Sequence, residues 1–501
     1  MKISALIIMM LLLLPSCGEE RSSSLDIALS QEPPVLDVML NSSISGRMIA
    51  VGNVYEKLLV LDADGNVRPE LAESYSLSED GHRLLFRLRS DVPFHNGDIL
   101  TAEDAAASMN RWLDSVPAAK NASGGAYFIA LDSVTLAIES SSNLLFLPVM
   151  MASSPQSAVI MPSECIDKAM DTGLVTEFIG TGTYEFSDWK TGEYIELKAF
   201  SDYKPYADTS SGLWGNKRKQ EDVLRYYFVP DEVTRTLGFE SGLYDAIDCV
   251  SSDDVQRLAD NGASILQGGE NGSIAIVFNK KDGISTDRIF RQAVSLIADR
   301  DTLMRSCYGD YGFSLHSDYM EKEQGIWLSS SDDPYGYMDA EKGKTLLDLS
   351  SYDGRAVRIL TSNLTNLDKI AVSLASCLES AGIDADVVVM DWASFLEKRK
   401  DPSSWDIYVS AMSKVPLPQQ KTYLSPDFPG WFSDDDILSD IAAMNSSSSI
   451  EEAAERWAEI QYRLWEYVPV MIPGHYSTIY AVAEGIDGVI AEDGFYFWNA
   501  E

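Results

Sequence analysis

The residues best suited to metal binding and acid–base chemistry are few in this sequence and lie far apart. The chain has only four histidines, at His82, His95, His316 and His475. None of them belongs to an HExxH motif or to a His/Cys spacing that holds zinc. The sequence also lacks a phosphate-binding GxxxxGK[ST] loop and a GxSxG nucleophile turn. These patterns predict no metal site, no cofactor and no enzymatic activity.

The charged residues are strongly unbalanced toward acid. The chain carries 77 Asp and Glu against 39 Lys and Arg, for a net charge of −38. Carboxylate pairs suited to general acid–base catalysis arise by chance at this density, so none is singled out. A nucleic-acid-binding protein needs a basic face to neutralise phosphates, and no nucleic-acid partner is expected. The acidity favours solubility, with steering of cationic ligands toward an acidic cleft as the alternative.

The N-terminus has the pattern of an export signal. Lys2 precedes an apolar run at residues 5–14, which is too short for the ~20 residues that a spanning helix needs. The segment that follows resembles a bacterial lipobox, in which Cys17 becomes the acylated first residue of the mature chain. Lipid chains would then hold the protein to a membrane at the periplasm or the cell surface. An ordinary signal peptide with an incidental cysteine is the alternative.

The remaining cysteines leave the thiol chemistry open. They lie at Cys165, Cys249, Cys307 and Cys377. An exported protein can pair some of them, and free buried thiols are the alternative.

The elements that must position these residues alternate between strands and helices. Residues 25–29 and 83–89 are expected as strands, and turns are expected at residues 62–66, 79–81 and 96–97. A capping box formed by Thr101 and Asp104 predicts a helix start. Further helices are expected at residues 287–305, 367–381 (ending at Gly382) and 451–467. Residues 350–362 and 383–390 are expected as the strands of a β-α-β unit.

This alternation predicts an α/β protein with mixed sheets. Hydrophobic cores stop growing near ~250–300 residues, so a chain of 501 residues is expected to form two or three lobes. No composition shift marks where one lobe ends. That pattern is typical of lobes that exchange strands with each other.

Several segments resemble the family 5 solute-binding proteins, the large peptide/nickel-type receptors of ABC importers. The similarity is densest in RPELAESY at residues 68–75, DGHRLLFRLR at 80–89 and PFHNGDILTAED at 93–104. Further matches are EPPVLD at residues 32–37, GTGTY at 180–184, and the FN, DR, RQA and DR pairs between Phe278 and Arg300. The glycines and the proline of these motifs suit turns and strand ends, and His95 is expected in a turn or core rather than at a ligand.

The resemblance implies a type II periplasmic-binding-protein-like fold (cluster C), with two lobes of mixed sheets and an extra domain. The expected division is 1–17 for the signal peptide and lipobox, 24–61, 178–266 and 472–501 for lobe I, 62–177 for the extra domain, and 267–471 for lobe II. It also implies capture of a small-molecule or oligopeptide ligand and delivery to ABC permease subunits, by a monomer without a cofactor. A surface lipoprotein receptor or chaperone-like binding protein that is not coupled to transport is the alternative.

The same resemblance indicates which residues face the ligand. They are Asn41, Ser42, Ser43, Ile44, Asn271, Gly272, Asn363, Trp392, Met412, Ser413, Lys414 and Val415. Trp392 would supply aromatic contact area, with ordinary packing as the alternative.

One loop departs from the pattern of the peptide receptors. Peptide-binding members carry an aromatic residue and an Asp there, and the Asp pairs with the amino terminus of the peptide. This chain reads AMSKVPLP at residues 411–418, with Val415 or a neighbour at the Asp position and Lys414 as the only charge. A buried ammonium without a carboxylate partner costs several kcal/mol. The expected ligand is therefore not a free peptide, and Lys414 favours an anionic or polyhydroxyl solute.

Overall fold

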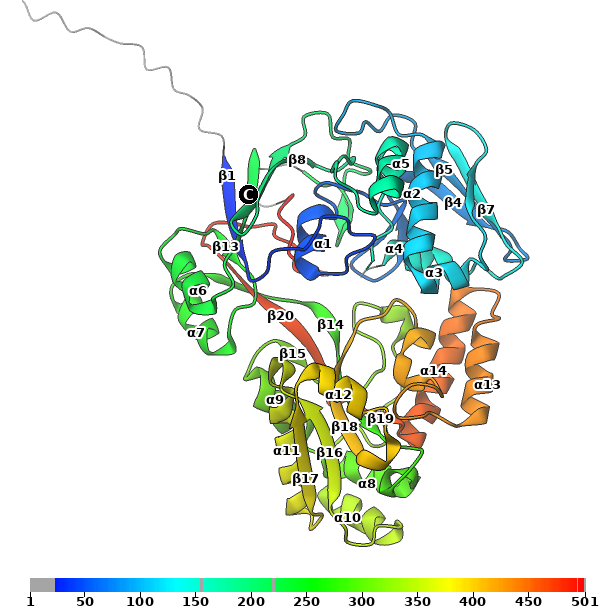
Figure 1. Ribbon diagram of the computed structural model, residues 1–501, viewed down its shortest axis with the longest axis vertical. Helices are drawn as coiled ribbons and strands as arrows, with labels where there is room; N and C mark the ends of the chain where they lie inside the picture. Colours follow the sequence, from blue (N-terminus) through cyan, green and yellow to red (C-terminus); the bar gives the residue numbers. More distant parts are fainter. Residues whose placement is uncertain (1–22, 154–155, 219–220, 493, 500–501) are drawn as a thin grey trace, which may run out of the picture.

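The structure is a computed structural model that describes residues 23–153, 156–218, 221–492 and 494–499. Figure 1 shows two lobes connected by two long antiparallel strands, β14 (Ser264–Phe278) and β20 (His475–Val482). We call the elements before β14, together with the segment after β20, the first lobe. The elements between β14 and β20 form the second lobe. The predicted lipidation site, Cys17, lies outside the described residues.

A single mixed sheet runs through both lobes. Its strands follow the order β17 (Ala385–Met390), β16 (Val357–Ser362), β18 (Ile407–Ser413), β14, β20, β13 (Ala246–Ile247), β1 (Ser24–Leu29), β12 (Val223–Phe228), β9 (Tyr194–Ala199) and β8 (Tyr184–Lys190). The short strands β15 (Phe313–Ser314) and β19 (Val470–Met471) pair with β20 and β14. Strand β1 is parallel to both its neighbours, whereas β14 is antiparallel to β18 and β20. The shared sheet explains why no linker separates the lobes in the sequence, and it confirms the α/β prediction with mixed sheets.

The first lobe carries smaller sheets and seven helices among its described residues. A four-stranded antiparallel sheet has the order β4 (Ala72–Leu77), β5 (Arg83–Leu88), β7 (Thr135–Glu139) and β6 (Phe128–Ala130). Two hairpins pair β2 (Leu59–Leu61) with β3 (Val67–Pro69) and β10 (Ser210–Ser211) with β11 (Trp214–Gly215). The helices are α1 (Ile44–Ala50), α2 (Ala102–Ser115), α3 (Pro117–Ala122), α4 (Leu147–Ala152), α5 (Ser163–Thr172), α6 (Glu232–Glu240) and α7 (Ser252–Asp260).

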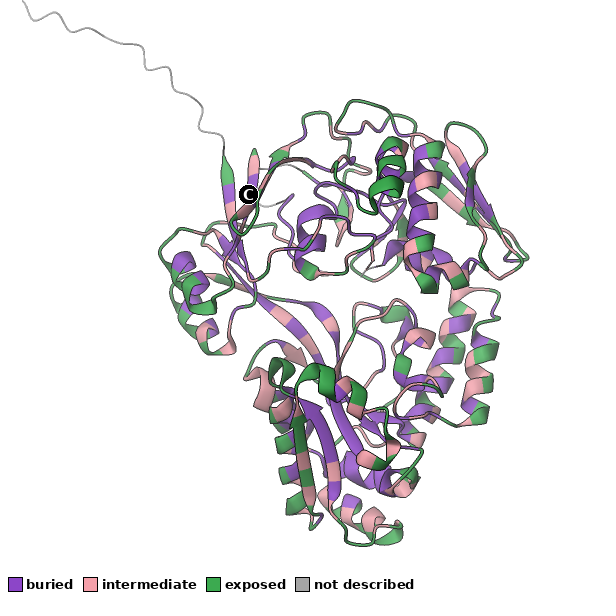
Figure 2. Cartoon of the chain, viewed as in Figure 1, coloured by how far each residue is buried: buried purple, intermediate pink, exposed green. Residues whose placement is uncertain are grey.

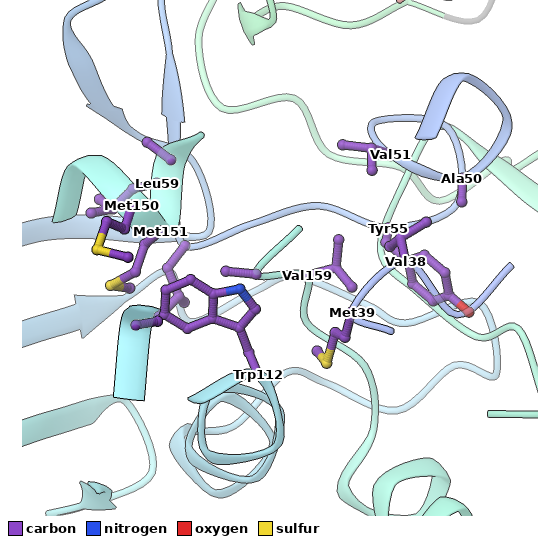
Figure 3. Close-up of a cluster of buried hydrophobic side chains, with 14 of the residues drawn as sticks. Val38, Met39, Ala50, Val51, Tyr55, Leu59, Trp112, Met150, Met151 and Val159 are labelled. Atoms are coloured by element: carbon purple, nitrogen blue, oxygen red, sulfur yellow. The ribbon is translucent and has the colours of Figure 1, made fainter. Parts of the chain in front are cut away.

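Helix α2 anchors the core of the first lobe. Its capping box forms as predicted, because the Thr101 hydroxyl accepts from the Asp104 backbone N–H while the Asp104 carboxylate accepts from the Thr101 backbone N–H. Further along α2, Trp112 lies among Met150, Met151 and neighbouring apolar side chains in Figure 3. Its indole N–H donates to a backbone carbonyl at 2.9 Å, so burial leaves no donor unpaired.

The second lobe contains the predicted β-α-β unit. Its described helices are α8 (Arg288–Ile297), α9 (Arg300–Tyr308), α10 (Ala340–Leu349), α11 (Leu367–Ser380), α12 (Trp392–Lys398), α13 (Asp435–Met444) and α14 (Ile450–Tyr467). Strand β16 is parallel to β17 and to β18, and α11 packs on all three. Gly382 follows α11 at a φ of 87°, which confirms the predicted helix end. Figure 2 shows β16 buried and the edge strand β17 largely exposed.

One segment predicted as a single helix forms two helices. Residues 287–305 were expected to form one helix, and the structure divides them into α8 and α9. The break falls at Ala298, which is extended (φ −71°, ψ 124°). Asp299 then caps α9 by accepting from the Thr302 backbone N–H. The side chain of Asp299 offers the new helix start a hydrogen bond that periodicity alone does not reveal.

Other local predictions are confirmed. The 62–66 turn forms between β2 and β3, and Asp62 Oδ1 accepts from the backbone N–H groups of Asp64 and Asn66. The turns predicted at 79–81 and 96–97 form within the hydrogen-bonded segments 78–81 and 94–97, with Gly81 and Gly97 at positive φ.

The sequence left the pairing of the cysteines open, and all four described cysteines are free thiols. In the described part of the chain, no helix has the length and apolarity needed to cross a membrane.

The sequence motifs around Glu70 and Thr181 meet at a buried lysine. Lys217 is 4% exposed, and its ammonium contacts the carboxylates of Glu70 and Glu56, the latter at 3.4 Å. Glu56 also accepts hydrogen bonds from the hydroxyls of Thr181 at 3.0 Å and Tyr203 at 2.9 Å. We call Glu56, Glu70 and Lys217 the motif cluster. Two motifs far apart in the sequence therefore serve the scaffold of the first lobe.

His95 lies in a turn, as the sequence predicts, and its ring also joins a second pair of motifs. Its Nε2 donates to the Gly182 carbonyl at 3.1 Å, and its Nδ1 accepts from the Gly180 backbone N–H at 3.2 Å. Burial lowers the pKa of His95 to about 4. A Cβ at Gly180 would lie 1.9 Å from the Val54 carbonyl oxygen, so only glycine permits this approach of the two backbones.

Candidate ligand-binding site

A cavity of about 470 Å³ lies between the two lobes. This volume falls within the ~300–1,000 Å³ typical of small-ligand sites. From the first lobe it is lined by Ser42, Ser43, Ile44, Arg47, Lys57, Leu61, Asp62, Ala63, Ala152, Ser153, Leu213 and Glu492. From β14, β20 and the second lobe it is lined by Asn271, Glu323, Gln324, Ser413, Lys414, Val415, Pro416, Tyr476 and Thr478. Two wider hollows on the outer surface are each lined by one lobe only.

Seven of the sequence-predicted ligand residues line this cavity. They are Ser42, Ser43, Ile44, Asn271, Ser413, Lys414 and Val415. Five others lie outside the lining: Asn41, Gly272, Asn363, Trp392 and Met412. These seven residues come from the loop before α1 and the first residue of α1, from β14, and from the end of β18 with the loop that follows it. The three segments are far apart in the sequence.

Asn41 supports the wall rather than forming it. Its amide donates to the Val35 carbonyl at 3.1 Å and to the Ser43 hydroxyl at 2.8 Å. The Ser43 hydroxyl in turn accepts from the Gly46 backbone N–H and caps α1. These bonds fix the loop that presents Ser42 and Ser43 to the cavity.

Gly272 and Met412 belong to the pairing of β14 with β18. Gly272 has a φ of 156°, and a Cβ there would lie 2.0 Å from the Met412 carbonyl oxygen. The residue is glycine because the neighbouring backbone leaves no space for a side chain. This close pairing carries Asn271 and Lys414 to the cavity wall, where the Lys414 backbone N–H donates to the Asn271 carbonyl at 2.9 Å.

Asn363 and Trp392 lie at the ends of β16 and β17. The Asn363 backbone N–H donates to the Met390 carbonyl, and its side chain is exposed. Trp392 begins α12 and stacks on Phe395 with ring centroids 5.5 Å apart, and 37% of its surface is exposed. In this structure Trp392 makes the packing contact that was the alternative to a ligand contact.

The charges around the cavity are balanced. Its described lining carries three cations, Arg47, Lys57 and Lys414, and three carboxylates, Asp62, Glu323 and Glu492. The Lys414 ammonium lies 3.5 Å from the Glu323 carboxylate. Lys414 is the only charged residue of its own loop. Its partner Glu323 belongs to a segment that matches none of the family motifs. Lys414 therefore has a carboxylate neighbour before any ligand binds, and the anionic or polyhydroxyl solute stays a prediction.

Asp62 stays ionised at the cavity edge. Burial by itself would raise its pKa, but hydrogen bonds from Arg68 and Asn66 hold the pKa of Asp62 below its usual value. The Arg68 Nε lies 2.7 Å from the carboxylate. Asp62 therefore stays ionised near neutral pH as one half of an ion pair with Arg68 at the edge of the cavity.

Gln324 fixes the opposite wall. Its amide donates to the carbonyls of Val415 at 2.8 Å and Pro416 at 3.2 Å. The Glu270 backbone N–H donates to the Glu323 carboxylate at 3.0 Å. Glu323 and Gln324 thus connect the loop after β18 to β14, and no sequence motif marked either residue.

Behind Asn271 and Tyr476, the chain brings together Glu270, His316 and His475. Burial would raise the pKa of Glu270, but its contact with His316 lowers that pKa to about 2. Burial would likewise lower the pKa of His316, and its contacts with the Asp318 and Glu270 carboxylates raise it to about 9. Burial and the charge on His316 together depress the pKa of His475. We call Glu270, His316 and His475 the hinge cluster.

A two-lobed α/β fold with a shared sheet and a cavity between the lobes defines a solute-binding protein. The sequence profile of the bacterial extracellular solute-binding proteins, family 5, matches residues 66–433. The chain belongs to this family of solute-binding proteins.

Relatives and solved structures agree with this assignment. The chain is 22% identical over 486 residues to a probable peptide ABC transporter periplasmic-binding protein of Sinorhizobium fredii, covering 89% of this chain and 88% of the relative. It is 25% identical to the nickel-binding periplasmic protein of Escherichia coli over 71% of this chain and 69% of that protein. The fold matches HbpA2 of Haemophilus parasuis with a TM-score of 0.81 at 18% identity, covering 95% of this chain and 99% of the other.

Proposed function

We propose that this protein captures a small zwitterionic solute in the cavity between its lobes and delivers it to the permease of an ABC importer. The balance of three cations and three carboxylates in the cavity lining carries the proposal. A zwitterion adds no net charge to a balanced cavity, whereas a multiply charged anion or cation would leave buried charge without a partner. The relatives support coupling to an importer, because they include a probable periplasmic-binding protein of a peptide ABC transporter, an oligopeptide-binding protein and a dipeptide-binding protein.

The solute would be enclosed by rotation of the lobes. The proposed division is lobe I at 24–61, 178–266 and 472–501, the extra domain at 62–177, and lobe II at 267–471. Strands β14 and β20 form the connection between the lobes, so a change of backbone angles within them would move one lobe against the other. Ligand selects the closed form through its higher affinity for that form.

Asn363 and Trp392 would contact the solute only in a closed form of the protein. Both lie on the second lobe and outside the present cavity lining. If closure brings this face toward the first lobe, the Trp392 ring adds to the wall. Chemical labelling of Trp392 with and without solute measures this directly.

The protein would act as a membrane-tethered monomer outside the cytoplasm. The lipobox-like segment ending at Cys17 supports an acyl anchor, and two or three acyl chains hold a protein to a bilayer far longer than one. Replacing Cys17 with Ser is expected to move the protein from the membrane fraction to the soluble fraction. Retention of the variant in the membrane fraction would contradict acylation at this residue.

The solute is identified by two linked measurements. Native mass spectrometry of protein purified without refolding is expected to show one co-purified small molecule per chain. A thermal-shift screen then compares amino-acid derivatives, di- and tripeptides, and their N-acetylated forms, with anionic sugars as the contrasting class. Zwitterionic compounds are expected to raise the Tm, and N-acetylation to abolish the shift. A response confined to anionic sugars would refute the proposed ligand class.

A further inference from the structure

Three residues that are remote in the sequence meet where the lobes are joined. Glu270 comes from β14, His475 begins β20, and His316 follows β15, which pairs with β20. One ligand atom from each of these residues lies within 4.8 Å of the other two. Glu270 directly precedes Asn271 in β14, and His475 directly precedes Tyr476 in β20. Asn271 and Tyr476 line the cavity, so the hinge cluster lies next to the candidate ligand site.

The backbone is irregular at this point. The register of β14 against β20 shifts between Gln267 and Glu270, and again between Glu270 and Gly272. Such bulges change the direction of a side chain relative to its neighbours in the strand, and they occur preferentially beside functional sites. Here the irregular residue is Glu270, whose carboxylate lies close to the imidazoles of His316 and His475.

His475 is the member of the hinge cluster that points to a ligand. The residue is fully buried, and neither ring nitrogen has a hydrogen-bond partner among the residues that the structure describes. Buried polar groups without partners are rare in native proteins, and a bound ion is one species that satisfies such a group. The ring lies against His316 with centroids 3.9 Å apart and planes 6° from parallel.

His316 is oriented as a metal ligand would be. Its Nε2 lies 3.0 Å and 3.1 Å from the two Glu270 oxygens. Its Nδ1 lies 3.3 Å from the Asp318 carboxylate. A carboxylate on the far nitrogen of a ligating histidine is the usual arrangement around protein-bound metals, because it fixes the tautomer and the ring direction. Zinc bonds of about 2.0–2.2 Å at a tetrahedral angle place N and O ligands roughly 3.3–3.6 Å apart. Metal bonds would therefore replace the 3.0 and 3.1 Å hydrogen bonds of His316 with Glu270 after a shift of a few tenths of an ångström.

We propose that Glu270, His316 and His475 form a binding site for a divalent transition-metal ion, with zinc as the reference ion. Two imidazoles and one carboxylate are donors that suit zinc, cobalt and nickel rather than calcium or magnesium. The lone pairs of an imidazole lie in its ring plane, so two stacked parallel rings cannot both point at one ion. One ring rotates on binding, and His475 is the ring that has no described hydrogen bond to lose. His316 binds the ion through Nε2 only after the proton on that nitrogen is released to solvent, so metal binding releases a proton.

A metal ion at this site would stabilise the junction between the lobes. It would connect β14, β20 and the segment after β15, which are the elements that join the lobes. Metal binding would therefore raise the free energy needed to separate these strands. The inference is independent of which solute occupies the cavity.

The test uses the untagged mature protein, stripped with EDTA and kept reduced, in a Cys249→Ser background that removes the exposed thiol. Isothermal titration with Zn²⁺ is expected to show one site per chain. His475→Gln and His316→Gln are each expected to weaken binding by at least about 100-fold. His82→Gln replaces an exposed histidine elsewhere and is expected to leave binding unchanged. Circular dichroism and the metal-free Tm establish that each variant is folded.

X-ray absorption tests the site with all of its histidines in place, so the result does not depend on whether a histidine variant folds. X-ray absorption of the zinc-loaded Cys249→Ser protein is expected to show two imidazole ligands and oxygen, without sulfur. Failure to bind Zn²⁺, a sulfur-containing shell, or equally tight binding by folded His475→Gln would each overturn the proposed site.

Discussion

The motif cluster and the hinge cluster both bury charge, but they differ in how completely their polar groups are paired. In the motif cluster, Lys217 contacts two carboxylates, and Glu56 also receives two hydroxyl donors. In the hinge cluster, His316 Nε2 hydrogen-bonds to Glu270, whereas both ring nitrogens of His475 lack hydrogen-bond partners among the described residues.

This difference separates scaffold from site. A fully paired buried network holds one arrangement of the chain, because removing any member leaves the others unpaired. An incompletely paired group costs stability in the structure as it stands, and it persists where another species can complete it. The motif cluster lies inside the first lobe, whereas the hinge cluster lies at the junction beside the cavity. The predictions below test this contrast in order of expected effect.

Replacing Lys217 with Met is expected to have the largest effect. The change leaves Glu56 and Glu70 buried without their cation, which costs about 3–5 kcal/mol of the free energy of unfolding. Urea denaturation of the mature protein measures it. The control is Lys168→Met, which removes an exposed ion pair with Glu177 and is expected to cost no more than ~1 kcal/mol. Equal losses in the two variants would remove the distinction between buried and exposed pairs.

The His95 contact is expected to make stability depend on pH. Its folded pKa of about 4 lies below the ordinary 6.5, so the unfolded chain binds a proton before the folded chain does. This contribution is fully present above pH 6.5 and is lost as pH falls toward 4, by about 3 kcal/mol in total. The measurement is the difference in unfolding free energy between wild type and His95→Gln at several pH values. A difference that stays constant from pH 7 to 4 would show that the ring is not held neutral.

Much of the scaffold could be predicted from the sequence because its signals are local. The Thr101 and Asp104 capping box, the glycine turns and the end of α11 at Gly382 depend on residues a few positions apart. The break between α8 and α9 was missed because apolar spacing continues across it, while the cap at Asp299 decides the outcome.

The site could be predicted only in part because it is assembled from distant segments. Motif position placed Ser43, Asn271 and Lys414 in the cavity. Glu323 lies in no motif, and its pairing with Lys414 depends on packing between segments far apart in the chain. His316 and His475 showed no metal-ligand spacing, because strand pairing rather than sequence proximity brings them together.

Glu323 tests whether a carboxylate of the cavity lining, next to the hinge cluster, binds the solute. Glu323→Gln is expected to weaken binding of the identified zwitterionic solute about 10-fold or more, because a charged hydrogen bond to its ammonium becomes a neutral one. Isothermal titration measures the affinity, and Trp392→Ala, outside the cavity lining, reports whether the second-lobe face contributes. The N-acetylated solute lacks the ammonium and is expected to show no measurable binding to either protein. Unchanged affinity of the zwitterionic solute for Glu323→Gln would contradict a contact between its ammonium and Glu323.

The smallest effect is expected at the incompletely paired histidine. In EDTA-treated protein, His475→Leu replaces a buried ring that makes no described hydrogen bond with an apolar side chain of similar volume. Removing an unsatisfied polar group offsets the lost ring stacking, so the unfolding free energy is expected to stay within about 1 kcal/mol of the wild type. Added Zn²⁺ should raise the Tm of the wild type alone. A metal-free loss comparable to that of Lys217→Met would show that His475 is as fully integrated as the motif cluster, and the contrast between the two clusters would fail.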